Sequence, residues 1–361
     1  MRILIVTGSS GGHIFPALGF LEVLKDKYKN IETLLVLPKK SIVNQTQTFG
    51  HKVDYISISP IKLRFDFKNI AAILKFFKSF LESIFILSVF RPHIVVGFGS
   101  LTCIPLVMSA WLFRIKTLIH EQNVVPGRAN RFLARFTDKI TISFAETRGY
   151  LKDYQKKIAL TGNPLRKELI RVDKNKAISF FGFSDDKFTI LVMGGSLGSH
   201  NINVEFLRAI STISDKRNLQ IIHLSGFKDY DLLKQNYKDS NVNVRLFGFL
   251  QSMQYAYSAC DLVICRAGAT SIAEVIFFGI PAIIIPYPYA YGHQLGNAKV
   301  LESKGCAIII QDKELDTDIL RQVIVNLLNN SDKLNEMHRS YDNLYMPNAN
   351  DLLADMVLSL N

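Results

Sequence analysis

Three glycine-rich loops are the first parts of this sequence that could do chemistry. They span Gly8–Gly12, Gly97–Ser100 and Gly194–Gly198, and each follows an apolar run and precedes a segment of helical length. A glycine loop in this position lets the backbone approach a ligand closely and aims its N–H groups at an anion. One such loop can be only a tight turn. Three of them, in both halves of the chain, predict two phosphate-bearing ligands that meet in a cleft between two domains.

A fourth segment has the composition of a nucleoside site. Cys265-Arg266-Ala267-Gly268-Ala269 follows another apolar run and leads through small residues to Glu274. Glu274 is expected in the early turns of a helix, where its carboxylate accepts hydrogen bonds from both ribose hydroxyls while N–H groups of the turn meet phosphate. The alternative is that Glu274 only stabilises the positive end of the helix.

A nicotinamide-dependent dehydrogenase would need different residues. Its fingerprint is GxGxxG, followed by an acidic residue at the end of the second strand that binds the ribose. None of the glycine loops reads GxGxxG, and the second apolar run ends in Leu37-Pro38-Lys39-Lys40 with Glu32 at its start. Hydride transfer is therefore not favoured.

Metal and thiol chemistry are not expected either. The triplets Asp229-Tyr230-Asp231 and Asp316-Thr317-Asp318 stand at expected helix starts, where capping explains their carboxylates. The cysteines show no CxxC pair and no histidine at zinc-ligand spacing, so we expect buried, reduced thiols at Cys103, Cys260, Cys265 and Cys306. We predict no dedicated metal site and no cofactor, although free Mg²⁺ could accompany a nucleotide.

Apolar strands that alternate with helix-length segments must position these residues. The predicted strands are 2–7, 31–37, 52–58, 93–97, 116–120, 138–143, 188–193, 219–224, 242–247, 260–264 and 281–286. Continuous apolar runs inside strands are typical of parallel sheets that helices cover on both faces. The predicted fold class is therefore α/β, with two doubly wound domains.

The two halves of the chain begin alike. ILIVTGSSGGH from Ile3 and ILVMGGSLGSH from Ile190 each predict a strand, a glycine loop and a helix, 187 residues apart. The turn-rich Gly162-Asn163-Pro164 follows the strand-like KIAL and is the expected boundary. We predict a first domain of residues 1–163 plus 347–361, to which a last helix over 351–360 crosses back, and a second domain of residues 164–346.

The positive charge of the chain lies in its first half. Residues 1–160 carry 23 Lys and Arg against 10 Asp and Glu, a net charge of +13, whereas residues 161–361 have a net charge of −1. Such an asymmetry indicates an anionic surface as partner. Nucleic acid is not favoured, because none of the usual reader motifs is present.

An apolar segment in the same half favours lipid as that surface. Residues 69–90 predict a helix that is apolar on more than one face, whereas a core helix needs only one apolar face. We expect part of residues 70–90 to meet lipid, with five basic residues at the level of the headgroups: Lys62, Arg64, Lys68, Lys75 and Lys78. The alternative is a helix packed between neighbours. The N-terminus reads as a strand and no stretch is long enough to span a bilayer, so we expect a cytoplasmic protein.

In order and spacing, six motifs resemble those of two-Rossmann-domain (GT-B) glycosyltransferases, and more narrowly the N-acetylglucosaminyltransferases that form lipid II in peptidoglycan synthesis. They are GSSGGH with Pro16, His120-Glu121-Gln122-Asn123, Gly162-Asn163-Pro164-Leu165-Arg166, Gly194-Gly195-Ser196-Leu197-Gly198, the segment from Cys265 through Glu274, and His293-Gln294 with Asn297-Ala298. The family's first loop reads GGTGGH with a following proline. Its middle loop usually reads GxGGY, and this chain departs from that pattern with Gly97-Phe98-Gly99-Ser100-Leu101.

The resemblance implies a reaction. UDP-N-acetylglucosamine donates its sugar, with inversion, to the C4 hydroxyl of MurNAc in undecaprenyl-diphospho-MurNAc-pentapeptide, which releases UDP and lipid II. The basic first domain then docks the lipid-linked acceptor at the cytoplasmic face of the bacterial inner membrane, and the second domain binds the soluble donor.

The resemblance also implies roles for single residues. His13 suits the base that takes the acceptor proton, with Glu121 in reserve, although His13 could instead orient its loop or bind the acceptor phosphate. Within the donor site, Glu274 takes the ribose, Ser196 the diphosphate and the backbone of Leu250 the uracil. The full set expected to bind UDP-N-acetylglucosamine is Ser10, Gly11, Gly12, Asn123, Arg166, Ser196, Leu250, Ala269, Thr270, Ser271, Ile272, Ala273, Glu274 and Gln294.

Two other functions stay open. A UDP-N-acetylglucosamine 2-epimerase shares the fold and the nucleotide, but it needs no membrane-facing surface and has paired carboxylates around C2. A catalytically silent lipid-docking subunit would lack the donor segment that ends at Glu274.

Overall fold

A computed structural model of the chain describes residues 1–39, 51–58, 67–214, 216–238, 240–290, 292–344, 346 and 348–360. They form two compact units: unit 1 is Met1–Lys167 with Met346–Asn361, and unit 2 is Glu168–Tyr345. The sequence places the boundary at 163/164, whereas unit 1 extends to Lys167. Two sets of contacts account for this extension. Asn350 bonds to the N–H and the carbonyl of Leu165 at 2.9 and 2.8 Å, and Lys167 donates from its N–H to Glu22 and from Nζ to Asp26 at 2.8 and 2.5 Å.

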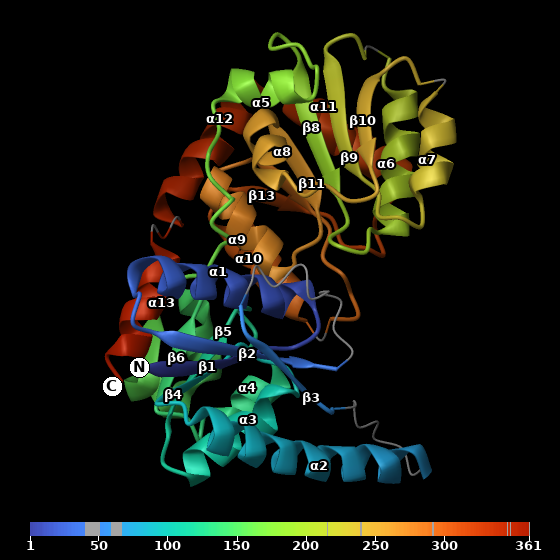
Figure 1. Cartoon of the computed structure of the whole chain (residues 1–361). Coiled ribbons are helices and arrows are strands. Elements are labelled where there is room, and N and C mark those ends of the chain that lie inside the picture. The colour runs from blue at the N-terminus through green and yellow to red at the C-terminus, as the bar shows by residue number, and fades with distance from the viewer. Residues whose placement is uncertain are drawn as a thin grey trace. The chain divides into compact units, whose positions relative to one another are not determined.

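Unit 1 is a parallel sheet with helices on both faces (Figure 1). Among the described residues the strand order is β3-β2-β1-β4-β5-β6-β7. The strands are β1 (Arg2–Val6), β2 (Glu32–Pro38), β3 (Val53–Ile56), β4 (Ile94–Gly97), β5 (Lys116–Glu121), β6 (Lys139–Ile142) and β7 (Ile158–Leu160). The helices are α1 (Gly11–Lys27), α2 (Phe67–Phe90), α3 (Cys103–Leu112), α4 (Arg128–Leu133), the 3₁₀ helices η2 (Ala145–Tyr150) and η3 (Lys152–Lys157), and α13 (Ala349–Leu358).

Alternate residues of β1 fill two separate cores. Ile3 and Ile5 pack with α1 and α13 on one face of the sheet, whereas Leu4 and Val6 pack with α2 and α3 on the other. Both sets are fully buried. A strand buried on both faces needs apolar side chains at every position, which explains the unbroken run ILIV.

The last helix, α13, completes unit 1. Its residues Leu353, Ala354 and Val357 belong to the core around α1, and Asp351 pairs with Lys27 of α1 at 2.6 Å. The prediction that the final helix crosses back to the first domain is confirmed by these contacts.

Unit 2 repeats the architecture with strand order β10-β9-β8-β11-β12-β13 among its described residues (Figure 1). The strands are β8 (Phe188–Met193), β9 (Leu219–Leu224), β10 (Asn243–Phe247), β11 (Leu262–Cys265), β12 (Ala282–Ile284) and β13 (Ala307–Ile309). The helices are α5 (Lys174–Phe180), α6 (His200–Thr212), α7 (Tyr230–Tyr237), α8 (Met253–Ala259), α9 (Ala269–Phe278), α10 (His293–Ser303), α11 (Thr317–Leu328), α12 (Ser331–Arg339) and the 3₁₀ helix η4 (Ser340–Asn343).

In each sheet the order in which the chain adds strands reverses at one place. In unit 1 the chain order reverses between β1 and β4, and in unit 2 between β8 and β11. The crevice at the carboxyl ends of the strands beside such a switch point is where open α/β sheets bind ligands. Two glycine loops of unit 1 follow β1 and β4, while the loop at Gly194 and the segment at Arg266 follow β8 and β11. The fold therefore brings the glycine loops of both units and the segment at Arg266 to the switch points, whereas other predicted site residues follow β5, β7, β10 and β12.

The parallel α/β architecture predicted from the sequence is confirmed, and all neighbouring strands run parallel. The prediction omitted β13 and recognised β7 only as the strand-like KIAL; both strands have three residues and lie at the sheet edges. All four cysteine side chains are buried, as expected. No helix in the described ranges is long and apolar enough to cross a bilayer.

Candidate active site

The two glycine loops of unit 1 lie side by side, because β1 and β4 are neighbours. A Cβ at Gly8 would lie 2.5 Å from Cβ of Ser100 and 2.9 Å from Cδ2 of His13, so only glycine fits there. Ser100 itself has a φ of +79°. The sequence thus departs from the family's glycine at a position where the backbone is left-handed.

Three predicted donor-binding residues start helix α1. Ser10 occupies the N-cap with an extended backbone, Gly11 is the first helical residue, and Gly12 follows it. Ser10 and Gly12 are exposed, and a Cβ at Gly12 would meet nothing within 4 Å. The positive end of a 17-residue helix therefore reaches the surface here, which suits a phosphate or a pyrophosphate.

His13 is held by Gln122. The Gln122 amide nitrogen donates to the carbonyl of Phe98 at 3.1 Å, so its Oε1 faces Nδ1 of His13 at 3.3 Å. Since Oε1 can only accept, the proton of a neutral His13 ring belongs on Nδ1. Nε2 is then the nitrogen able to take a proton, as a general base requires.

Glu121, the reserve candidate for the base, holds a loop instead. Its side chain is buried, with 1% exposed. It accepts hydrogen bonds from the N–H groups of Asn123 and Gly127 at 2.9 and 3.0 Å, and from the side chains of Asn123 and Asn130 at 3.2 and 2.7 Å. These contacts favour a role for Glu121 in fixing the loop that carries Asn123 over a role in proton transfer.

Arg166 also lies in unit 1. Its guanidinium stands 4.8 Å from the ring centroid of Phe15, a cation–π arrangement on helix α1. Phe15 lies two residues after His13 in α1, so Arg166 lies close to the first glycine loop.

In unit 2 the third glycine loop turns sharply between β8 and α6. A Cβ at Gly198, whose φ is +75°, would lie 2.1 Å from the carbonyl oxygen of Ser225. The loop is therefore pressed against the end of β9, while Ser196 at its tip is exposed. Exposed backbone ahead of the 13-residue helix α6 suits the predicted contact with a diphosphate.

Arg266 ties this loop to two other segments. Its guanidinium donates to Ser199 Oγ at 2.8 Å and to the carbonyl of Ile285 at 3.1 Å, and it pairs with Asp312 at 2.5 Å. The residue is nearly buried. Arg266 thus ties the end of the glycine loop, at Ser199, to the segments that carry Ile285 and Asp312.

The predicted nucleoside segment forms the start of helix α9. Gly268 is the N-cap, and the predicted residues Ala269, Thr270, Ser271, Ile272 and Ala273 are the first residues of the helix. Glu274 follows in the second turn, with 7% of the residue exposed. Its Oε2 accepts a hydrogen bond of 2.6 Å from the hydroxyl of Tyr257.

The last two predicted donor contacts are Gln294, in the first turn of α10, and Leu250, in a loop of unit 2. Gln294 accepts hydrogen bonds from the N–H groups of Ala267 and Tyr287 at 3.1 and 2.9 Å, so its Oε1 braces the turn beneath the site. Leu250 lies between β10 and α8 and is largely buried. Both side chains belong to the carboxyl edge of the sheet, as the nucleotide hypothesis requires.

The two Asp-x-Asp triplets serve the fold. Asp316 caps α11 by accepting from the N–H of Ile319 at 2.8 Å, as predicted. Asp229 occupies the N-cap position of α7 but accepts from His200 and Asn203 instead, at 3.0 and 2.8 Å. In the part of the chain that the structure describes, no group of three or more His, Cys, Asp or Glu is arranged to hold a metal ion.

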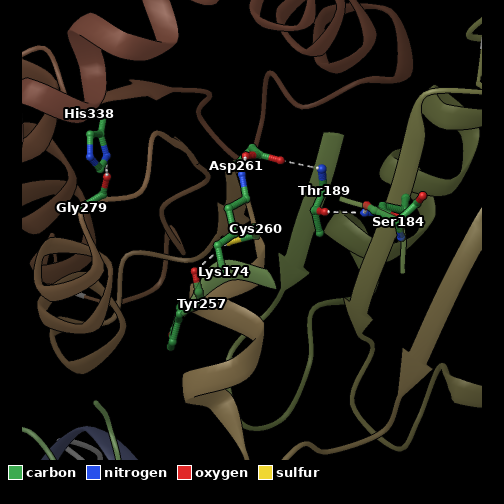
Figure 2. Close-up of polar contacts among 9 residues, drawn as sticks. Lys174, Ser184, Thr189, Tyr257, Cys260, Asp261, Gly279 and His338 are labelled. Atoms are coloured by element: carbon green, nitrogen blue, oxygen red, sulfur yellow. Dashed lines mark hydrogen bonds and ion pairs between the residues drawn. The ribbon is translucent and has the colours of Figure 1, made fainter. Parts of the chain in front are cut away.

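Unit 2 also has a pocket of about 470 Å³ at the amino ends of its strands, on the edge of the sheet away from the predicted donor site. Its lining includes Tyr257, Cys260, Gly279 and Pro281. Its polar groups hold the fold together (Figure 2). Asp261 pairs with Lys174 and accepts from the N–H of Thr189. His338 reaches the carbonyl of Gly279. These groups join α5, β8, β11 and α12.

Sequence reasoning assigned no role to three residues that the structure brings into these sites. Gln122 belongs to the motif His120-Glu121-Gln122-Asn123, which is the signal that marks it. Tyr257 and Asp312 belong to none of the six motifs, and only the fold brings them to Glu274 and Arg266. Of the predicted membrane residues, Lys75 and Lys78 are exposed on α2. Lys62 and Arg64 lie outside the described residues, as does the side chain of Lys68.

Two family models match the chain. Residues 3–142 match the glycosyltransferase family 28 N-terminal domain, and residues 189–352 match the glycosyltransferase family 28 C-terminal domain. Together they span the glycine loops of both units and the segment that ends at Glu274.

Several known proteins are similar over nearly the full length. Those from Desulforamulus reducens and Caldanaerobacter subterraneus are named UDP-N-acetylglucosamine--N-acetylmuramyl-(pentapeptide) pyrophosphoryl-undecaprenol N-acetylglucosamine transferase. They are 33% and 35% identical, over 99% and 100% of this chain and 97% and 100% of theirs.

Among solved structures, Acinetobacter baumannii MurG has a TM-score of 0.79 at 26% identity, with 99% of this chain and 100% of that chain covered. UDP-GlcNAc 2-epimerase from Neisseria meningitidis, with a TM-score of 0.68 at 17% identity over 99% of this chain and 100% of that one, shares the fold. The chain therefore belongs to glycosyltransferase family 28, and within it to the N-acetylglucosamine transferases that these relatives represent.

Proposed function

We propose that this chain transfers N-acetylglucosamine, with inversion, from UDP-N-acetylglucosamine to the C4 hydroxyl of MurNAc in undecaprenyl-diphospho-MurNAc-pentapeptide. The relatives above carry this donor and this acceptor in their names. The 2-epimerase alternative is not favoured, because the likeness to that enzyme at 17% identity extends to the fold alone.

Unit 2 binds the donor in this proposal. Glu274 accepts hydrogen bonds from the ribose hydroxyls, and the first N–H groups of α6 and α9 face the diphosphate. Arg266 keeps the glycine loop in place through Ser199. A preorganised set of N–H donors stabilises the charge that develops on UDP as the bond to the sugar breaks.

Unit 1 supplies the base. Nε2 of His13 takes the proton of the C4 hydroxyl while that oxygen attacks C1 of N-acetylglucosamine and the bond from C1 to the UDP oxygen breaks, with its electron pair leaving on UDP. Gln122 keeps the other ring nitrogen protonated. Attack on the face opposite UDP inverts the configuration at C1.

The observation that carries the donor assignment is the buried carboxylate of Glu274 in the second turn of α9, at the switch point of the sheet. Replacement of Glu274 by alanine removes the acceptor of two charge-assisted hydrogen bonds, so we expect the KM for UDP-N-acetylglucosamine to rise on the order of 100-fold. The measurement is disaccharide formation from labelled UDP-N-acetylglucosamine and a lipid I analogue in detergent.

Two matched variants sharpen this test. Asp318→Ala removes an exposed carboxylate at the start of α11 and should leave both kcat and KM unchanged. His13→Ala should lower kcat and leave UDP binding in unit 2 intact. Equal turnover with UDP-glucose, or no product with the lipid acceptor, would refute the proposed reaction.

We also propose that α2 docks unit 1 on an anionic membrane surface. Leu74, Phe77, Leu81, Phe85 and Val89 form a stripe along this helix, and each is between 64% and 69% exposed. Their spacing of three and four residues places them on one face. A continuous row of exposed apolar side chains along a helix is unusual unless a partner covers it.

Charge and neighbouring aromatics support the same partner. Lys75 and Lys78 are exposed on the same helix. Helix α3, which packs on α2, ends at the exposed Trp111, Leu112 and Phe113. Aromatic and basic side chains beside an apolar face are typical of helices that lie in the interface of a bilayer. The acceptor has its diphosphate at that level, so the proposal places the protein at the cytoplasmic face of the inner membrane.

A further inference from the structure

The hydroxyl of Tyr257 reaches Glu274 from a neighbouring helix. It comes from α8 and donates to Glu274 Oε2 at 2.6 Å. Tyr257 is 2% exposed and Glu274 is 7% exposed, so the hydrogen bond is nearly shielded from water. Hydrogen bonds between a hydroxyl and a carboxylate are short and strong, and this one has the length expected for such a pair.

Tyr257 is itself firmly held. Its ring stacks on Phe278 of α9 with centroids 5.0 Å apart and an angle of 23° between the planes. Its hydroxyl also lies 3.5 Å from the sulfur of Met193, at the end of β8. The ring therefore joins α8, α9 and β8, the elements that border the switch point of unit 2.

Tyr257 can act only as a donor to the carboxylate. Burial and the nearby Glu274 raise the pKa of its hydroxyl well above the ordinary value of 10.0, so it stays protonated at neutral pH. A glutamate side chain has three rotatable bonds, and one fixed oxygen restricts all of them. A carboxylate that is oriented before the ligand arrives binds it more tightly than one that must be ordered.

We propose that Tyr257 is a positioning residue for the donor nucleotide, which holds the Glu274 carboxylate in the orientation that accepts hydrogen bonds from the ribose hydroxyls. The inference rests on the proposed function of Glu274. This adds α8 to the helices that shape the donor site.

The experiment compares the affinities for UDP and 2′-deoxy-UDP by titration calorimetry. Wild-type protein should prefer UDP by about 10-fold, since the deoxy analogue leaves the carboxylate short of a partner. In Tyr257→Phe we expect this preference to fall by at least about threefold, with a higher KM for UDP-N-acetylglucosamine and little change in kcat. A residue that only fills space would weaken both nucleotides equally.

Matched variants separate the possible failures. Tyr255→Phe removes a hydroxyl from the same helix, where the ring stacks on Phe180 at 4.2 Å, and should leave the preference unchanged. Tyr257→Met, which also lacks the donor, should reproduce the Tyr257→Phe ratio if the phenylalanine variant does not fold.

Glu274→Gln serves as the reference. If Glu274→Gln abolishes the preference for UDP and both Tyr257 variants keep it, the inference fails while the ribose assignment of Glu274 stands. If Glu274→Gln also keeps the preference, the ribose assignment fails and the inference with it.

Discussion

Ser100 shows the tension between this chain's sequence and its backbone at the scale of one residue. Its φ of +79° lies in the left-handed region, which costs a residue with a side chain about 1–2 kcal/mol, and glycine recovers part of this. We therefore expect Ser100→Gly to raise the free energy of unfolding by about 0.5–1 kcal/mol, measured by urea denaturation.

A second serine-to-glycine change controls for composition. Ser211→Gly, in the last turn of α6, removes the hydrogen bond from Ser211 Oγ to the carbonyl of Leu207 at 2.7 Å and should lower stability by about 0.5 kcal/mol. Equal losses in the two variants would contradict the strain at Ser100.

Residue types that carry charge or a proton were predictable from motifs, whereas the contacts that hold them in place were not. His13 and Glu274 lie near the starts of helices that follow a strand and a loop, and this strand–loop–helix pattern can be recognised in the sequence. Gln122 lies 109 positions from His13 and Tyr257 lies 17 positions from Glu274. Such pairs form only when the strands take their order in the sheet, which the local sequence does not encode.

At the scale of the element, α2 carries the proposed membrane contact, and its apolar and basic residues predict different defects. Phe77→Ser with Leu81→Ser and Phe85→Ser should lower the fraction that sediments with vesicles at least about tenfold, because the buried apolar area is lost. Lys75→Glu with Lys78→Glu should weaken binding to anionic vesicles only, and high salt should produce the same loss.

Leu232→Ser, on the exposed face of α7 in unit 2, is the matched control and should sediment like the wild type. Binding by the triple serine variant at the wild-type level would leave α2 without a lipid partner.

The elements themselves were largely predictable. Strands such as β1 and β8 can be recognised in the sequence as continuous apolar runs, because both their faces are buried. The edge strands β7 and β13 pair on one side only and contain three residues each, so β7 shows only as the strand-like KIAL and β13 gives no pattern. The exposed stripe on α2 was predictable, because residues 69–90 form a helix that is apolar on more than one face. The tertiary structure decides which of these faces packs on α3.

At the scale of the whole molecule, one buried histidine in each unit ties stability to pH. Burial lowers the pKa of His120 in unit 1 to about 4 and that of His223 in unit 2 to about 3, from an ordinary 6.5. The unfolded chain therefore binds more protons than the folded one below pH 6.5, and stability falls as the pH falls.

Between pH 6.5 and 5 we expect each histidine to remove about 1.5 kcal/mol from the free energy of unfolding. Urea denaturation across this range measures the loss, and His120→Gln should flatten the part that belongs to unit 1. Stability that stays constant from pH 6.5 to 5 would mean that these rings protonate without unfolding.

The return of α13 to the first sheet has a consequence for how the protein is made. Ile3 and Leu18 leave the ribosome early, yet the core around them stays open until Leu353, Ala354 and Val357 have been translated. Unit 2 precedes these residues in the chain, so most of it can fold before unit 1 is complete. The part of the molecule that is begun first is thus finished last, and during that interval the α1 side of its sheet offers an apolar surface to chaperones.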